Sequence, residues 1–157
     1  MPAGSNGQCN GMINQLGINE PTSASDSNNP TVVLLDDDSI TLLALHSILE
    51  HTKATVIECE SESCVLRSCQ PESTIVDVFV ADVILPTSNG PEVVRKVKPL
   101  QPRMRLLYIS GFSLTELRRR GLLSPEDLAP GKIEFLQKPF PPEIFLASVE
   151  KLLAIQN

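Results

Sequence analysis

The chain has 157 residues, of which 41% are hydrophobic and 20% are charged, so it can bury one hydrophobic core of ordinary size. Its formal net charge of −6 at pH 7 argues against a domain that binds nucleic acid. No stretch approaches the roughly 20 apolar residues that a membrane-spanning helix needs, so we expect one soluble globular domain.

Residues 1–30 differ in composition from the rest of the chain. Asn, Gly and Ser dominate this segment, and all 13 Lys and Arg residues follow it. Its larger apolar residues, which lie between Met12 and Ile18, are too few to pack a core. We therefore predict a disordered tail over residues 1–30 and a single ordered domain over residues 31–157. A short amphipathic docking element around Met12–Ile18 is the alternative interpretation.

The first predicted strand is followed by three acids. Thr31–Leu35 (TVVLL) is a short apolar run, typical of a strand buried on both faces of a sheet. Asp36, Asp37 and Asp38 come directly after it. Asp38 or Ser39 can cap the next helix, which carries its apolar residues on one face: Leu42, Leu45, Ile48 and Leu49. Capping explains one acid, and the crowding of the others favours a divalent cation that neutralises them.

A second strand over Thr55–Glu58 and a second helix over Glu60–Cys69 follow. The chain has four cysteines, which are Cys9, Cys59, Cys64 and Cys69, and they contain no C-x-x-C pair. The N-terminus also lacks the basic start and apolar core of a secretion signal, so we expect a cytoplasmic protein with reduced thiols. Cys64 and Cys69 lie five residues apart on the predicted helix, hence on different faces, which argues against a metal site between them.

The central predicted strand, Val78–Ala81 (VFVA), is an apolar run that stops at Asp82. The loop after it contains Pro86 and the turn-forming pair Asn89-Gly90. In open α/β sheets the reactive groups gather where strands end, so Asp82 is well placed for chemistry. The alternative is an acid that merely ends a strand.

A short helix and a fourth strand come next. Pro91 suits the first turn of the helix, which Pro99 ends. The strand Arg105–Ile109 (RLLYI) finishes at Ser110, which places a small hydroxyl at the same edge as the acids.

Two helix starts precede the last strand. Ser113 with Glu116 predicts a capping box for a helix that reaches about Gly121, and Ser124–Asp127 predicts a second start. The run Arg118–Arg120 is interpreted as a solvated helix face, with a partner-binding patch as the alternative.

The fifth predicted strand, Ile133–Gln137, ends in Lys138, and a final helix spans about Pro142–Ala154. Five strands then alternate with five helices, which indicates a doubly wound parallel sheet of the α/β class. The carboxyl ends of parallel strands share one rim, where we expect the polar residues that follow strands one, three, four and five: Asp36, Asp37, Asp82, Ser110 and Lys138.

This ordered set resembles the receiver domain of two-component response regulators. The motifs that carry the resemblance are the acid cluster after strand one, the pattern D-x-x-x-P with Gly90 four residues past the proline, Ser110 after strand four, and Lys-Pro-Phe after strand five. The resemblance covers residues 31–157. It implies a flavodoxin-like sheet with strand order 2-1-3-4-5.

The resemblance also implies roles for the acids. Asp82 would be the phosphoacceptor, and Asp36 and Asp37 would be the pair that binds Mg²⁺. The same ion would contact Asp82 and the backbone carbonyl of Ile84.

Other roles follow from the same resemblance. Lys138 would hold the phosphoryl group, Ser110 would be the switch hydroxyl, and Phe135 falls on the aromatic switch position. Ile84 and Phe112 occupy the positions that flank the approach of hydrolytic water, and both are too apolar to assist it, which implies a long-lived phosphoryl state. Lys138-Pro139 is implied to be a cis peptide.

The partners implied are a histidine kinase or a histidine phosphotransfer domain, and a downstream protein. Neither nucleic acid nor a membrane is expected as a partner. The face formed by the fourth helix, fifth strand and fifth helix is implied as the signalling surface and as a homodimer interface. The chain would accept a phosphoryl group and lose it slowly rather than turn over a substrate. The loop Leu122–Lys132 departs from the compact family pattern and resembles receivers attached to hybrid histidine kinases.

Two alternatives stay open. Asp36-x-Asp38 after an apolar strand also resembles the haloacid-dehalogenase phosphatases, in which the first aspartate would be the nucleophile. That motif expects Thr or Val where this chain has Ile40, and it leaves Asp82 without a role. The second alternative is a pseudo-receiver that only binds a partner, and the complete residue set argues against it.

Overall fold

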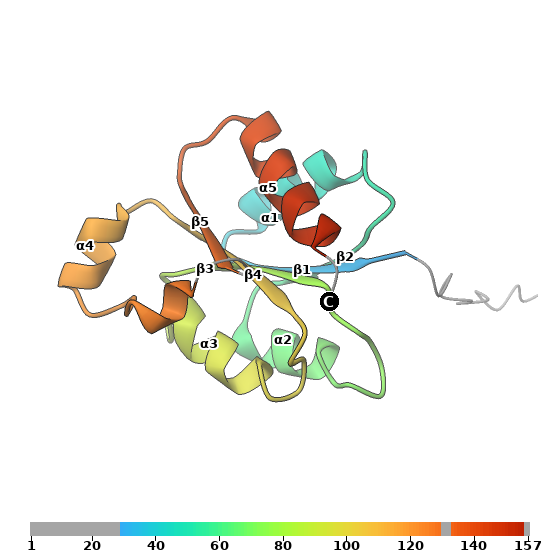
Figure 1. The fold of residues 1–157 in the computed structure, drawn as a ribbon, viewed down its shortest axis with the longest axis horizontal. Coiled ribbons are helices and arrows are strands. Elements are labelled where there is room, and N and C mark those ends of the chain that lie inside the picture. The colour runs from blue at the N-terminus through green and yellow to red at the C-terminus, as the bar shows by residue number, and fades with distance from the viewer. Residues whose placement is uncertain (1–28, 130–132, 156–157) are drawn as a thin grey trace, which may run out of the picture.

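The computed structural model describes residues 29–129 and 133–155. Its strands form one parallel five-stranded sheet in the order β2-β1-β3-β4-β5, with helices on both faces (Figure 1). In chain order the elements are β1 (Thr31–Leu35), α1 (Ser39–Leu49), β2 (Thr55–Cys59), α2 (Glu62–Ser68), β3 (Val78–Asp82), α3 (Gly90–Val97), β4 (Arg105–Ser110), α4 (Leu114–Arg119), the 3₁₀ helix η1 (Glu126–Leu128), β5 (Ile133–Gln137) and α5 (Pro142–Ala154). The predicted fold class and the strand order are confirmed.

Two sequence predictions fall on residues that the structure does not describe. Residues 1–28, which make up nearly all of the predicted tail, lie outside the described part of the chain, and so does the docking element around Met12–Ile18. Within the described ranges, no helix is long and apolar enough to cross a membrane.

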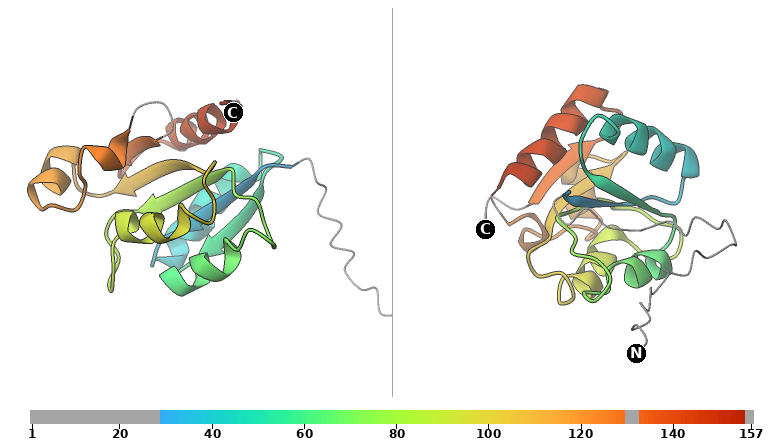
Figure 2. Two further views of the ribbon diagram at one scale, coloured as in Figure 1. Left: turned by 60° about the horizontal axis from the view of Figure 1, so that its bottom comes forward. Right: turned by 90° about the vertical axis from the view of Figure 1, so that its right-hand side faces the viewer.

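The sheet separates two hydrophobic cores. Helices α1 and α5 cover one face, and α2 and α3 cover the other, as the views in Figure 2 show. Successive residues of β1 alternate between the layers: Val32 and Leu34 pack toward α1 and α5, whereas Val33 and Leu35 pack toward α2 and α3. Because both faces are buried, the central strands are continuously apolar rather than alternating.

Side-chain caps begin four of the helices. Asp38 caps α1, where its carboxylate accepts from the Ile40 backbone N–H at 3.1 Å and from the Thr41 hydroxyl at 2.8 Å. Ser61, Asn89 and Ser113 cap α2, α3 and α4 in the same way. These contacts satisfy amide groups that the first turn of a helix leaves without an intrahelical partner. Half of the predicted capping box at α4 is confirmed, because the Glu116 N–H donates to Ser113 while the Glu116 carboxylate pairs with Arg119 and Arg120.

The second predicted helix start, at Ser124–Asp127, yields only the three-residue η1. Ser124 and Asp127 bond each other reciprocally, with the Ser124 N–H donating to the Asp127 carboxylate at 2.8 Å. Ala129 then takes φ −54° and ψ 129°, the extended conformation that a following proline imposes, and Pro130 follows it. The proline therefore stops the helix after one turn.

The expectation of reduced thiols is wrong for two cysteines. Cys59 and Cys64 form a disulfide, and Cys69 is free and buried. Cys59 ends β2 and Cys64 lies in the first turns of α2, which brings their Cα atoms to 5.4 Å, inside the range that a disulfide requires. The sequence spacing gave no sign of this pairing because the tight strand-to-helix turn creates it.

The backbone of Asp82 lies so close to residue 90 that only glycine fits there without strain. A Cβ atom at this position would overlap the carbonyl oxygen of Asp82 and would lie 3.2 Å from its carbonyl carbon. The Gly90 N–H donates to the Val83 carbonyl at 2.9 Å, so the start of α3 folds tightly against the end of β3. The absence of a side chain at residue 90 therefore allows the loop after Asp82 to fold tightly against the end of β3.

We predict that Gly90→Ala destabilises the protein by about 1–3 kcal/mol, because the added methyl group must push two backbone segments apart. Chemical unfolding followed by circular dichroism measures this. Gly111→Ala is the matched control, since nothing lies within 4 Å of a Cβ atom there. Equal stability of the two variants would contradict the role given to Gly90.

Candidate functional site

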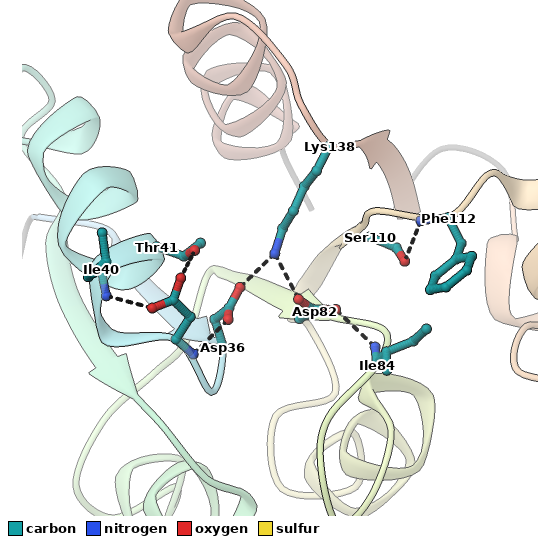
Figure 3. A network of polar contacts seen from close by, with 9 residues as sticks. Asp36, Ile40, Thr41, Asp82, Ile84, Ser110, Phe112 and Lys138 are labelled. Atoms are coloured by element: carbon teal, nitrogen blue, oxygen red, sulfur yellow. Dashed lines mark hydrogen bonds and ion pairs between the residues drawn. The ribbon is translucent and has the colours of Figure 1, made fainter.

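The carboxyl ends of four strands deliver polar side chains to one rim of the sheet, as Figure 3 shows. Asp36 follows β1, Asp82 ends β3, Ser110 ends β4, and Lys138 follows β5. The parallel pairing of these strands places their ends side by side. The predicted convergence at this rim is confirmed.

Lys138 joins the two buried acids. Its ammonium group donates to Asp36 Oδ2 and to Asp82 Oδ2, each at 2.8 Å. The Asp36 side chain is 2% exposed and that of Asp82 is 11% exposed, so both carboxylates are largely removed from water. Burial lowers the pKa of Lys138, but its hydrogen bonds to Asp36 and Asp82 outweigh this and raise it overall, so the ammonium stays charged.

The three acids of the rim form one cluster. Carboxylate oxygens of Asp36, Asp37 and Asp82 all lie within 4.8 Å of one another. Asp36 Oδ1 also accepts the Asp38 N–H at 2.9 Å, which fixes the loop, while Asp37 is exposed. Three carboxylates and one ammonium leave a net charge of −2, which one divalent cation would balance. Hard carboxylate oxygens are the ligands that Mg²⁺ takes, so the donor set fits the predicted ion.

Asp82 is held at both of its oxygens. Oδ1 accepts the Ile84 N–H at 2.9 Å, and Oδ2 accepts from Lys138. Burial raises the pKa of Asp82, while the contacts with Lys138 and Ile84 lower it, and the net direction is upward. The Asp82 carboxylate is thus oriented but poorly solvated, and a cation beside it would favour its charged form.

Ser110 lies beside this pair and is 1% exposed. Its hydroxyl accepts the Phe112 N–H at 3.2 Å, and its carbonyl accepts the Lys138 N–H at 2.7 Å. The second contact ties the end of β4 to the residue that carries the ammonium group. The peptide bond between Lys138 and Pro139 is cis, as the resemblance implied.

The other residues singled out from the sequence surround the rim. Phe135 lies opposite Tyr108 in the pairing of β4 with β5, is partly buried, and packs against the core. Ile84 is partly buried, and Phe112 is 38% exposed and lies beside Ser110 (Figure 3). The guanidinium of Arg120 lies 4.3 Å from the centre of the Phe112 ring, within cation–π range.

Sequence reasoning missed this contact. It treated Arg118–Arg120 as a uniform solvated face, whereas Arg120 reaches back to Phe112 and pairs with Glu116. The eight-residue spacing between Phe112 and Arg120 gave no signal, because only the turn into α4 brings the two together.

Known proteins resemble this chain over most of its described residues. Residues 32–150 match the family model described as the response regulator receiver domain. The sensor kinase CckA of Brucella abortus (strain 2308) is 27% identical over 131 residues, which are 83% of this chain and 13% of that protein. The response regulator receiver protein CpdR of the same organism is 24% identical over 122 residues, which are 78% of this chain and 95% of that protein.

Solved structures agree with this match. The crystal structure of a response regulator receiver protein from Sinorhizobium medicae WSM419 has a TM-score of 0.65 and 26% identity, and it covers 80% of this chain and 95% of its own. The chain therefore spans nearly the whole length of CpdR and of the Sinorhizobium medicae protein, but only a small part of the length of the sensor kinase.

We predict that Asp37→Ala weakens Mg²⁺ binding about tenfold or more, because it removes one charged ligand from the cluster. Asp37 is exposed, so its loss should leave the fold intact. Isothermal titration calorimetry measures the affinity. Glu72→Gln is the control, since it removes an exposed carboxylate from the connection that enters the opposite rim of the sheet. Unchanged affinity in Asp37→Ala would contradict the metal assignment.

Proposed function

The chain belongs to the response regulator receiver domain family, and we propose that Asp82 is the residue of this receiver domain that accepts a phosphoryl group. The observation that carries this proposal is the placement of Asp82, with one oxygen bound by the Lys138 ammonium and two further acids within reach. A carboxylate in this position is oriented by the protein and faces the open rim.

Phosphoryl transfer to Asp82 would proceed from a phosphohistidine of a histidine kinase or a histidine phosphotransfer domain. The P–N bond to the histidine breaks and a P–O bond to the Asp82 carboxylate forms. The departing ring takes one proton from solvent, which leaves an acyl phosphate and a neutral imidazole. Such transfers pass through a loose transition state, so catalysis rests on alignment and on neutralising the phosphoryl oxygens. Lys138 and Ser110 are the groups of this chain that would hold those oxygens.

Asp36, Asp37 and Asp82, with the backbone carbonyl of Ile84, would hold Mg²⁺. When bound, the ion would neutralise charge on the carboxylates and on the phosphoryl group. Lys138 would then leave its contact with Asp82 Oδ2 in favour of a phosphoryl oxygen while keeping its contact with Asp36. The ammonium group therefore already lies beside the charge that transfer would create.

The signal would leave the site through Ser110 and Phe135. Phosphorylation would draw the Ser110 hydroxyl away from the Phe112 N–H and toward the phosphoryl group, and Phe135 would move inward. Phe135 is only partly buried, so an inward movement would remove more of its ring from water. The surface of α4, β5 and α5 would then bind a downstream protein or a second copy of the chain.

The chain would act as a phosphoryl carrier that loses its phosphoryl group slowly, and not as a turnover enzyme. The dehalogenase-type alternative is disfavoured because the Asp38 carboxylate is engaged in capping α1. A pseudo-receiver is disfavoured because Asp37, Asp82, Ser110 and Lys138 are all present at one rim.

We predict that Asp82→Asn abolishes labelling by acetyl phosphate in the presence of Mg²⁺, since the amide matches the carboxylate in shape but cannot attack phosphorus. Phos-tag electrophoresis measures the labelled fraction. Asp38→Asn is the matched control, because its amide oxygen can still cap α1, and it should be labelled normally. Labelling of Asp82→Asn together with loss of labelling in Asp36→Asn would favour the phosphatase alternative, in which Asp36 is the nucleophile.

We further predict that the phosphoryl state is long-lived and that Ile84→Asn with Phe112→Glu shortens it. Water must approach in line with the P–O bond, and two apolar side chains there cannot orient it. Each change of about 1.4 kcal/mol in the barrier alters the rate tenfold. The loss of phosphate is followed after removal of the phosphodonor.

Two comparisons make this lifetime experiment decisive. Ile75→Asn makes a similar change at a side chain that is 74% exposed and precedes β3, so it should leave the lifetime unchanged. Mg²⁺ affinity should also be the same in the double variant and in the wild type. A double variant that decays no faster than wild type would contradict the shielding role.

A further inference from the structure

A pair of cysteines lies next to the end of β1, the strand that leads into the acid cluster. Cys59 is the last residue of β2, and Cys64 is bonded to it from the first turns of α2. The bond closes a short turn, so it restrains the local geometry of this turn more than it constrains the unfolded chain.

The two sulfur atoms differ in access. Cys59 is 0% exposed and belongs to the core under α2 and α3, whereas Cys64 is partly exposed. In a reduced protein, an oxidant from solution would therefore meet Cys64 first. The sulfur of Cys64 lies 3.6 Å from the Glu58 carbonyl, and that of Cys59 lies 3.8 Å from the Ser68 hydroxyl, so each thiol would also have a polar neighbour.

The third cysteine of the described residues differs from this pair. Cys69 is buried and free, and burial raises the pKa of its thiol to about 11. A thiol of this kind is unreactive at neutral pH. Cys69 thus provides an internal comparison for the reactivity of the other two.

The pair is connected to the acid cluster by the backbone. Leu35 lies opposite Cys59 in the pairing of β1 with β2, and the Asp36 N–H donates to the Cys59 carbonyl at 3.2 Å. Asp36 is also the acid that binds Lys138 and the Asp38 N–H. The backbone of Asp36 is therefore held by Cys59, which is one of the two residues of the disulfide.

We propose that Cys59 and Cys64 are a reversible thiol–disulfide modification site, oxidised by a peroxide and reduced by a dithiol, whose state changes the cation affinity of the acid cluster. The Cys64 sulfur attacks a peroxide oxygen and becomes a sulfenic acid as water leaves. The Cys59 sulfur then attacks Cys64, the S–S bond forms and the second water leaves. Two electrons pass from the thiols to the peroxide, and a dithiol returns them by exchange.

Reduction frees the turn at residues 60–63 from its covalent restraint. The Cys59 carbonyl, and with it the Asp36 N–H bond, then gains mobility. This weakens the backbone hydrogen bond that orders Asp36, so Mg²⁺ affinity should fall by about twofold to tenfold in the reduced form. The thiol chemistry is independent of the proposed phosphoryl transfer, and only the affinity change rests on the metal assignment.

The thiol chemistry is tested on the full chain carrying Cys9→Ser, which leaves the three cysteines of the described residues. The protein is reduced with dithiothreitol, exposed to stoichiometric hydrogen peroxide, alkylated under denaturing conditions and weighed. We expect peroxide to leave Cys69 alone accessible to alkylation and peptide mapping to find Cys59 linked to Cys64. Three alkylated cysteines after peroxide, or Cys64 over-oxidised beside an alkylated Cys59, would overturn the proposal.

Two variants keep this test specific. Cys69→Ala should form the same cross-link, because its thiol takes no part. Cys64→Ser replaces a partly exposed side chain and should give no cross-link while its circular dichroism stays unchanged. A cross-link that depends on Cys69 would contradict the assignment of the pair.

The coupling is tested by calorimetric titration of Mg²⁺ into the oxidised and the reduced protein, both of which keep Cys59 and Cys64. The reduced form should bind about twofold to tenfold more weakly. Cys64→Ser should bind like the reduced form under both conditions. Equal affinities in the two redox states would overturn the coupling, whereas failure of Asp82→Asn to block labelling would overturn only the proposed function.

Discussion

The contact on which the site depends is the Lys138 ammonium between Asp36 and Asp82. Two carboxylates at 2% and 11% exposure would repel each other and lose hydration, and burial of unpaired charge is costly. The strand order explains how one lysine reaches both. Lys138 follows the edge strand β5, and its side chain must pass the end of β4 to meet the acids of β3 and β1. Ser110, a small residue, ends β4 and leaves room for it.

Much of this arrangement could be predicted from local pattern. Apolar runs defined the strands, because both faces of a parallel sheet are buried, and Asp38 and Ser113 marked helix starts through their capping chemistry. The acid cluster was visible because three consecutive acids after an apolar strand cannot all be explained by capping. The order of the strands was not available from pattern, since buried parallel strands look alike in sequence; it came from the resemblance.

Features that depend on tertiary placement were not predicted. The disulfide arises because the end of β2 and the first turns of α2 approach to 5.4 Å between Cα atoms, and a separation of five residues does not encode that turn. The contact of Arg120 with Phe112 depends likewise on the direction in which α4 leaves β4. Ser124–Asp127 did not start a full helix because Pro130 ends it after one turn, and the capping signal alone had given no weight to this proline.

The charge balance of the rim limits what the site can hold. Three carboxylates and one ammonium leave two negative charges in a partly buried space, and a phosphoryl group adds about two more while it neutralises the carboxylate that it joins. Lys138 is already included in this balance and cannot offset the added charge. A divalent cation would balance the two negative charges of the cluster and would leave about one after phosphorylation, so the same acids that repel one another would make phosphorylation conditional on the ion. The unfavourable crowding of Asp36, Asp37 and Asp82 would thus be the physical basis of the cation-dependent chemistry that we propose for this rim.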